Sequence, residues 1–495
     1  MTLPPPMPFF SAAANFAAGN DTPREFLERC LSHVEEFEPA VGAFVCHDIG
    51  AARAAADRSA ARWRDGRPLS PIDGMPLAIK DIIETADMPT EQGSPLFAGC
   101  RTGRDAASVA ALREAGAVIL GKVVTTEFAA TEPRGTRNPW DRERTPGGSS
   151  SGSAAAVACG MVPAALGTQV VGSILRPASF CGCVGFKPSV GRINRGGSYD
   201  YFSQSCTGVL AASLEDAWLV AISIAARVGG DPGYPGLQGP AEPPPPRRPR
   251  TLAVLQTSGW ADTASEARAA FEAAVVRLAD AGIALADRHA DPVIEEVEVA
   301  IADSAQLTRT INAWEGRWPL NTYRERDASK LSRSALERLA MAEAMTLTEY
   351  GAAITVRQRN RETHARLAAR YDAAIILAAP GAAPVGLGST GNPVSTCQFR
   401  CSVFRPCRYR CSRSTGCRWG CRSPVLSVRT PRCSRWRPRS AICWAQRLRF
   451  PQFRRRRRSS GGSPCRRRQK RTPIASTSRS SRCALPNGSG SAMSG

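Results

Sequence analysis

The sequence predicts an α/β fold in which helices flank a mixed central β-sheet, followed by a basic C-terminal segment. Short apolar runs typical of buried strands alternate along the chain with longer amphipathic runs that have helical spacing. The 495 residues are enough to bury a large core in one domain or two. The composition then changes abruptly at about residue 395, where arginine, serine and cysteine replace the apolar pattern.

The first elements follow from capping and spacing signals. Residues 1–20 are rich in proline and alanine, and we expect them to be loose. Thr22 suits a helix N-cap and Pro23 the first helical position, and the residues that follow have helical spacing. Residues 74–80 indicate a turn into a short apolar strand that ends at a lysine.

The remaining elements are expected in the following order: helices at about 50–65 and 106–115, a strand at 117–122, helices at 154–162 and 214–230, a strand at 252–256, helices at about 264–282, 292–307 and 333–370, and a strand at 373–379. The proline-rich stretch 230–250 leaves the organisation open. It fits a linker to a second lobe, but the strand after it could also return to the first sheet.

The net charge of +22 suggests nucleic-acid binding until the charges are located along the chain. Residues 391–495 contain 26 lysines and arginines and no aspartate or glutamate. The rest of the chain holds 39 basic and 43 acidic residues, which is typical of a mildly acidic globular protein. The excess positive charge therefore belongs to the C-terminal segment alone.

Cysteine usage and the N-terminus bear on the compartment. Seven of the 17 cysteines precede residue 391 and show no disulfide framework. The N-terminus lacks the basic region and apolar core of a secretory signal, and no apolar run reaches the roughly 20 residues that a membrane span needs. We therefore expect reduced cysteines, a cytoplasmic protein and no membrane partner.

Two serine-bearing glycine turns lie within residues 146–188. The first turn, residues 147–152, leads directly into an alanine-rich helix, so its backbone N–H groups point outward as at a helix N-terminus. The second turn ends in Gly172 and Ser173. Glycine lets a backbone approach a ligand closely. A Gly/Ser linker before a helix is the alternative, and it explains less because the second turn follows at close range.

This stretch, PGGSSSGSAAAVACG and then GTQ and GSILRPASFCGCVGFKPS, resembles the signature of the amidase signature family. Members of that family are serine hydrolases that cleave amide C–N bonds with a Ser–Ser–Lys triad. The two candidate serines are 24 residues apart, as the family pattern requires, and PLAIKD places Lys80 at the family's lysine. The resemblance runs from about residue 25 to about residue 394 and implies an amidase domain over residues 21–394.

The resemblance implies a role for each of three side chains. Ser173 would be the nucleophile that forms an acyl-enzyme. Ser149, the family's cis-peptide serine, would relay its proton, and neutral Lys80 would accept it. Burial would make this lysine a usable base by lowering its pKa. The alternative is that Lys80 is a structural cation and that Ser149 caps a turn.

The resemblance also implies the groups around this triad. The oxyanion hole would consist of the backbone amides of Val170, Val171, Gly172 and Ser173. Contacts to the substrate are expected from Gly147, Gly148 and Ser150. The substrate would be a small-molecule amide, and no metal or cofactor is expected.

Two features depart from the family pattern. Val171 replaces the first glycine of Gly-Gly-Ser, so a turn that needs positive φ would be strained by about 1–3 kcal/mol and turnover would suffer. Gln169 and Leu175 replace an aspartate and an arginine, and an arginine follows one position later, at Arg176. Both charges are absent together, so the chain looks more like the general amidases than like the subunit that amidates misacylated tRNA.

The segment 395–495 allows three interpretations: a nucleic-acid-binding tail, a metal site or a coding accident. Its cysteines are irregularly spaced, lack histidine and are crowded by arginines, which argues against zinc. GC-rich codons for this segment, read one base out of register, can encode strands and a helix similar to the end of the same family. We therefore favour a frameshift near Val394–Ser395, which would leave a disordered tail and unpaired strand edges.

Two functions remain open. The first is an amidase acting on small carboxamides, impaired by Val171 and by the altered C-terminus. The second is an inactive, amidase-like protein whose arginine-rich tail binds nucleic acid or other polyanions in a salt-sensitive, incidental way. The sequence does not identify the amide, and it leaves a homodimer open.

Overall fold

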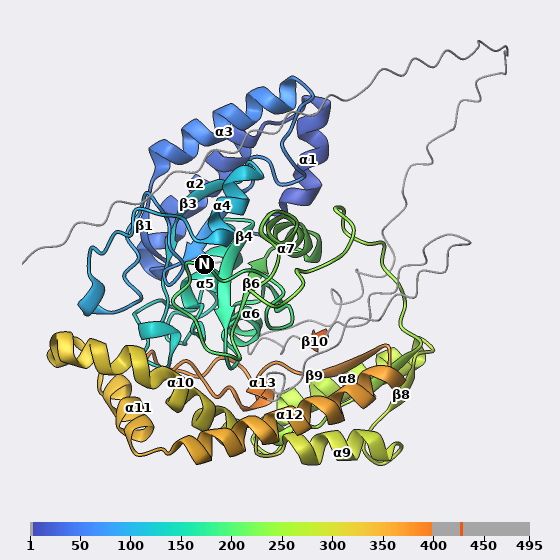
Figure 1. Cartoon of the computed structure of the whole chain (residues 1–495). Helices are drawn as coiled ribbons and strands as arrows, with labels where there is room; N and C mark the ends of the chain where they lie inside the picture. Colours follow the sequence, from blue (N-terminus) through green and yellow to red (C-terminus); the bar gives the residue numbers. More distant parts are fainter. Residues whose placement is uncertain (1–2, 398–425, 429–495) are drawn as a thin grey trace, which may run out of the picture. The chain divides into compact units, whose positions relative to one another are not determined.

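The computed structural model describes residues 3–397 and 426–428, all of which belong to one unit, residues 1–434. Most of the basic segment 395–495 lies outside the described residues. The prediction that this segment is disordered therefore also concerns residues outside the described ranges. Two β-sheets organise the described part of the chain, and helices pack around them (Figure 1).

The larger sheet has six strands in the order β1-β3-β2-β4-β6-β5. These strands are β1 Phe44–His47, β2 Pro76–Lys80, β3 Val118–Val123, β4 Ala164–Gln169, β5 Val184–Phe186 and β6 Cys206–Ala211. β3, β2 and β4 are parallel neighbours, whereas the other pairings are antiparallel. The predicted α/β fold with a mixed central sheet is therefore confirmed. Because β2 and β4 run in the same direction, their carboxyl ends lie at one edge, where Lys80 ends β2.

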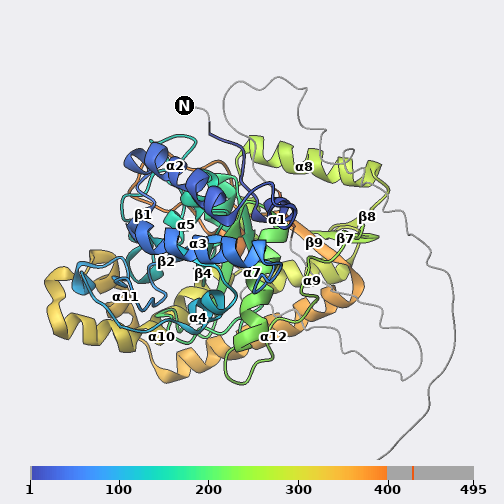
Figure 2. The ribbon, with the colours of Figure 1, turned by 90° about the horizontal axis from the view of Figure 1, so that it is seen from above.

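Helices cover both faces of this sheet, because alternate residues of each strand point to opposite faces. On β4, Leu166 packs in a core cluster with helices α4 (Ala107–Glu114) and α7 (Leu214–Val228). Its neighbour Ala165 points the other way, into a cluster with α2 (Pro23–Val41) and α5 (Ser151–Ala158). Seen from above, α2 and α5 lie on one side of β4 and α4 on the other (Figure 2).

The N-terminal segment is helical where the sequence predicts a loose chain. Residues Phe9–Ala18 form helix α1, in which Phe9 and Phe16 are buried. Their rings contact Phe26 of α2, with ring centroids 5.3 and 6.3 Å away. The carboxylate of Asp216 accepts hydrogen bonds from the first N–H groups of α1, at 3.1 and 2.8 Å. The prediction is wrong here because these aromatic anchors outweigh the proline-rich composition.

The smaller sheet has four strands, all parallel, in the order β10-β9-β7-β8. They are β7 Thr251–Val254, β8 Ala284–Ala286, β9 Ala373–Leu377 and β10 Leu426–Val428. The strand predicted at 252–256 therefore joins a second sheet and does not return to the first. β10 pairs with the edge of β9 at residues 375–377, so the expected unpaired edge is wrong for this part of the strand.

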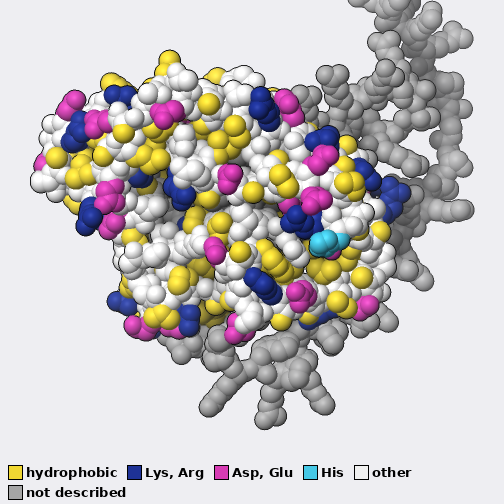
Figure 3. Space-filling view, turned by 90° about the horizontal axis from the view of Figure 1, so that it is seen from below, with side chains coloured by type: hydrophobic (Ala, Val, Ile, Leu, Met, Phe, Trp, Pro, Cys, Tyr) yellow, Lys and Arg dark blue, Asp and Glu magenta, His cyan; other side chains and the backbone are white. Residues whose placement is uncertain are grey.

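Between β7 and β9 the chain forms the helices α8 Ser265–Asp280, α9 Pro292–Ile301, α10 Ser304–Asp327, α11 Arg333–Glu343 and α12 Leu347–Arg370. The single helix predicted over 333–370 is broken because Thr346 caps a new one, with Glu349 completing a capping box. On the face shown in Figure 3, basic and acidic side chains alternate over the surface. Ion pairs such as Arg324–Glu343, between α10 and α11, join side chains of opposite charge. No helix of the described ranges has the length and apolarity required to cross a bilayer.

Gly152 lets α5 approach the main chain of its neighbours. A Cβ at this position would overlap the carbonyl oxygen of Ala43 and the amide nitrogen of Val124. We expect Gly152→Ala to lower the free energy of unfolding by about 1–3 kcal/mol, measured by urea denaturation. Gly351→Ala in α12 is the matched control, because nothing lies within 4 Å of its added Cβ. It should raise stability by up to about 1 kcal/mol. Equal effects of the two substitutions would contradict the expectation.

Candidate active site

Lys80 ends β2 and is fully buried. Its Nζ donates hydrogen bonds to the hydroxyl of Ser149 at 2.7 Å and to that of Thr168 at 2.9 Å. Thr168 lies on the neighbouring strand β4, whereas Ser149 belongs to the loop that precedes α5. The parallel pairing of the two strands therefore holds the lysine against the first serine turn.

Burial lowers the pKa of Lys80 from its ordinary value of 10.5 to about 7. The negative charge of Asp200 acts in the opposite direction and raises this pKa, but its effect is smaller. The hydrogen-bond partners of the amine are neutral hydroxyls, which stabilise an ammonium less than a carboxylate does. At neutral pH a large fraction of the amine is therefore uncharged and able to accept a proton.

The first serine turn lies against the second. The peptide bond between Gly148 and Ser149 is cis, and Gly147 adopts a φ of 84°. The Ser150 N–H donates to the carbonyl of Ser173 at 3.2 Å, so the two turns are joined through their main chains. Ser149 and Ser150 are buried, whereas Ser173 keeps 7% of its surface exposed.

The second turn connects β4 to helix α6 (Leu175–Cys181). The side-chain carbonyl of Gln169 accepts hydrogen bonds from the N–H groups of Ile174 and Leu175, at 2.8 and 3.0 Å. A neutral amide thus caps α6 from the position that holds aspartate in the family pattern. The start of α6 is therefore capped even though the aspartate and arginine of the family pattern are both absent.

The three predicted catalytic residues lie close together in the structure, but they do not all contact one another through their side chains. Lys80 and Ser149 are in direct contact, whereas Ser173 adjoins them through its main chain. The Ser173 hydroxyl has no hydrogen-bond partner among residues 3–397. The backbone N–H groups of residues 170–173 likewise donate to no acceptor in that range. These four donors are therefore available to an outside acceptor, as an oxyanion hole requires.

Val171 does not carry the strain that the sequence predicts. The non-glycine residues with positive φ in the described part of the chain are Gln92, Phe128 and Ala129. Val171 is not among them, so its backbone stays outside the left-handed region that disfavours β-branched residues. The turn does not have the positive φ on which that strain depends, and the effect of Val171 on turnover stays a prediction.

Arg176 and two threonines that the sequence did not single out complete the surroundings of the turns. Arg176 is buried, and its Nη2 donates to the Gly148 carbonyl at 2.8 Å and to the Thr390 hydroxyl at 3.1 Å. A Cβ on Gly172 would overlap the hydroxyl of Thr396. The segment that carries both threonines therefore lies against both serine turns, although it is more than 200 residues away in sequence.

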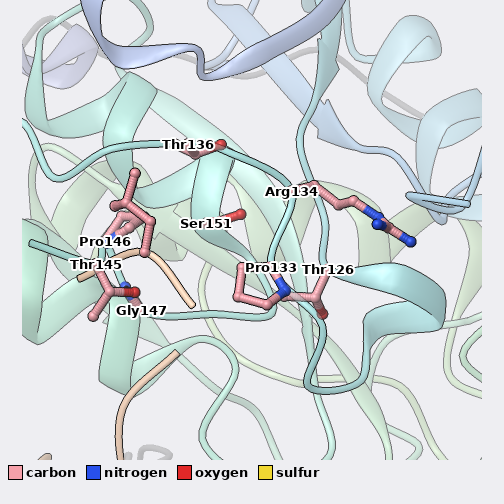
Figure 4. Close-up of a pocket in the computed structure, with 9 residues that line it drawn as sticks. Thr126, Pro133, Arg134, Thr136, Thr145, Pro146, Gly147 and Ser151 are labelled. Carbon is pink, nitrogen blue, oxygen red and sulfur yellow. The ribbon is translucent and has the colours of Figure 1, made fainter. Parts of the chain in front are cut away.

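A narrow recess opens beside the first serine turn (Figure 4). Its lining consists of Thr126, Pro133, Arg134, Thr136, Thr145, Pro146, Gly147, Ser151 and Leu387. Figure 4 shows Thr145, Pro146 and Gly147 on one side of it and Pro133 and Arg134 on the other. Among the predicted site residues Gly147 alone lines it, so the recess adjoins the candidate triad and does not contain it.

A buried ion pair fixes the strand end that carries Lys80. Lys122 on β3 contacts the carboxylate of Asp81 at 3.0 Å, and both side chains are buried. The same amine donates to the Pro89 carbonyl at 2.9 Å and to the Thr90 hydroxyl at 2.7 Å. Burial raises the pKa of Asp81 and lowers that of Lys122, while their mutual attraction opposes both shifts. Because Asp81 follows Lys80 directly, this pair holds the lysine's backbone in place.

The described residues contain no cluster of side chains suited to bind a metal ion. Within these ranges, no group of three or more histidine, cysteine, aspartate or glutamate side chains is placed to bind one. Most of the cysteines before residue 391 are buried.

Comparison with known proteins points to one family. A family model described as Amidase matches residues 25–402. A glutamyl-tRNA(Gln) amidotransferase subunit of Chloroflexus aurantiacus is 44% identical over 229 residues, which are 45% of this chain and 46% of that protein. The chain therefore spans about half the length of the curated relatives it matches.

Solved structures extend the similarity to the fold. A crystal structure of an amidase shares 27% sequence identity, with a TM-score of 0.66, and the match covers 80% of this chain and 90% of that one. The peptide amidase from Stenotrophomonas maltophilia is 25% identical, with a TM-score of 0.64 over 80% of this chain and 88% of its own.

The Asp81–Lys122 pair can be tested by a double-mutant cycle. Lys122→Met leaves a carboxylate buried without its partner, so we expect it to lower the free energy of unfolding by about 3–5 kcal/mol. The double variant Asp81→Asn/Lys122→Met should recover part of that loss, because the orphaned charge is gone. Urea denaturation at neutral pH measures each corner of the cycle. If the double variant loses the sum of the two single losses, the pair is not coupled and the positioning role fails.

Proposed function

Because the chain belongs to the amidase family, we propose that it hydrolyses the C–N bond of a carboxamide through an acyl-enzyme on Ser173. One observation carries the proposal: a fully buried Lys80 amine, with a pKa of about 7, donates to the Ser149 hydroxyl at 2.7 Å. A lysine paired with a carboxylate would stay charged and could not act as a base. The similarities to amidases and to one component of an amidotransferase support action on amide bonds in general.

In the proposed reaction, Ser173 Oγ attacks the amide carbonyl carbon while its proton moves to Ser149 Oγ. The Ser149 proton moves in turn to the lone pair of Lys80, which becomes an ammonium. When the C–N bond breaks, Lys80 returns a proton through Ser149 to the leaving amine. Water then attacks the acyl-enzyme by the same relay and releases the acid. We expect the hydrogen bond between the Ser173 and Ser149 hydroxyls to form only when substrate is bound, as is common for catalytic hydrogen bonds.

The same proposal assigns the groups around the reacting carbon. The backbone N–H groups of residues 170–173 would receive the oxyanion, since they have no acceptor among residues 3–397. One such donor is typically worth about 10²–10³ in rate. Gly147, Gly148 and Ser150 would contact the substrate, because this turn lies directly beside Ser173.

A second candidate function rests on charge. Residues 391–495 hold 26 basic residues and no acidic ones, and such a segment binds polyanions by releasing their counterions. If our frameshift hypothesis holds, this binding is incidental to the family's chemistry. Amide hydrolysis that depends on Ser173 separates the two candidates.

We expect Ser173→Ala to abolish hydrolysis of a simple carboxamide, measured as ammonia release by the full-length protein. Loss of a nucleophile in a serine hydrolase costs on the order of 10⁶ in kcat. Mass spectrometry of the unsubstituted protein should detect a covalent adduct on the peptide that contains Ser173. The control is Ser265→Ala, at an exposed position that begins α8, and it should keep the full rate. An unchanged rate in Ser173→Ala would refute the proposal.

The pH dependence tests the base. Only the uncharged form of Lys80 accepts a proton, and its pKa is lowered to about 7, so kcat/KM should rise as the pH increases through about 7 and then level off. Lys80→Met should remove this activity, whereas Lys330→Met, at an exposed position, should keep the profile. A rate that is flat between about pH 6 and 8.5, or that rises only near an ordinary lysine pKa, would exclude Lys80 as the base.

A further inference from the structure

Asp200 is a buried carboxylate with no hydrogen-bond donor in the described part of the chain. Only 1% of its surface is exposed, and neither Oδ1 nor Oδ2 has a partner there. Its backbone is held in place: its N–H donates to the Ser198 hydroxyl, and the N–H of Tyr199 donates to the carbonyl of Ile82 at 2.9 Å. Ile82 closely follows Lys80, and the charge of Asp200 acts on that lysine.

The cations near Asp200 are engaged elsewhere. Arg195 pairs with Asp231 at 2.6 Å, and its Nη1 donates to the main-chain carbonyls of Asp200 and Phe202. Lys80 is hydrogen-bonded to two hydroxyls. A buried carboxylate without compensation is costly, so proteins pair it with a cation. Among the described residues, no cation forms a direct ion pair with Asp200, and the position beside the candidate base favours a ligand.

Unpaired hydroxyls near this position add further acceptors. Thr207 lies directly opposite Thr168 in the β4–β6 pairing, so both threonines point to the same face of the sheet. Thr168 is the residue that contacts Lys80. The hydroxyls of Thr207 and of nearby Ser205 are buried and have no partner in the described ranges. Each can accept an N–H donor, as a ligand with several such donors would require.

We propose that Asp200 binds the protonated amino group of the substrate, so that the preferred substrate is an amide with an ammonium group close to the scissile carbonyl, such as an amino-acid amide. This inference rests on the proposed amidase function and names its substrate class. The positive charge of the ammonium balances the negative charge of the Asp200 carboxylate. Its remaining N–H groups can donate hydrogen bonds to the neighbouring hydroxyls. A neutral amide of the same size leaves the carboxylate uncompensated.

The test compares alaninamide with propionamide, which differ by one amino group. Isothermal titration of the full-length Ser173→Ala protein at neutral pH measures binding without turnover. We expect alaninamide to bind about 10- to 100-fold tighter, the range of a charge-assisted hydrogen bond. Asp200→Asn in the same background should remove this preference. Asp280→Asn, on the exposed end of α8, is the matched control and should keep it.

Each outcome bears on one proposal. Equal binding of the two amides, or a preference that survives Asp200→Asn, overturns the ammonium site even if propionamide is hydrolysed by the unsubstituted protein. If the preference for alaninamide depends on Asp200 but the unsubstituted protein hydrolyses neither amide, the ammonium site is supported and the amidase function is refuted. If Asp200→Asn fails to fold, ethylammonium chloride competes with alaninamide in the Ser173→Ala protein. Displacement then supports the site, and no displacement beyond that by equal sodium chloride overturns it.

Discussion

The contact between the buried Lys80 amine and the Ser149 hydroxyl is the constraint on which the rest of the site depends. A charged ammonium at this depth would cost several kcal/mol in desolvation, and no carboxylate is hydrogen-bonded to it among the described residues. Burial therefore lowers the pKa of this side chain, as its proposed role as a base requires. Three features hold it there: the parallel pairing of β2 with β4, the Asp81–Lys122 ion pair, and the serine turn that precedes α5.

The candidate triad was predicted from the resemblance to the amidase signature family, whose motif residues lie in short stretches of sequence. Glycine turns, a helix start and an apolar strand that ends in lysine are visible over short windows. The contacts of Thr168 and Arg176 were not predicted because they depend on segments that meet only in the folded chain: a neighbouring strand for Thr168, and a loop more than 200 residues away for Arg176. The strain considered for Val171 is absent because residue type alone does not determine a backbone angle.

At the level of the fold, alternation of strands and helices was enough for the class and for most elements. It could not show that the strand after the proline-rich connector starts a second sheet, since strand partners are long-range contacts. Helix α1 was missed because its stability comes from Phe9 and Phe16 packing against a later helix, and not from its own composition. Residues 390–396 are likewise placed by tertiary contact with both serine turns.

The depressed basicity of Lys80 also links folding to the protons of the solution. In an unfolded chain this side chain regains an ordinary pKa of 10.5, whereas its native pKa is about 7. Between these two values the unfolded state carries a proton that the native state lacks, so the stability contributed by this group rises with pH across that window and is lowest below it. At about pH 8, folding releases close to one proton from this side chain to the buffer, and the heat of folding then includes the buffer's enthalpy of binding that proton.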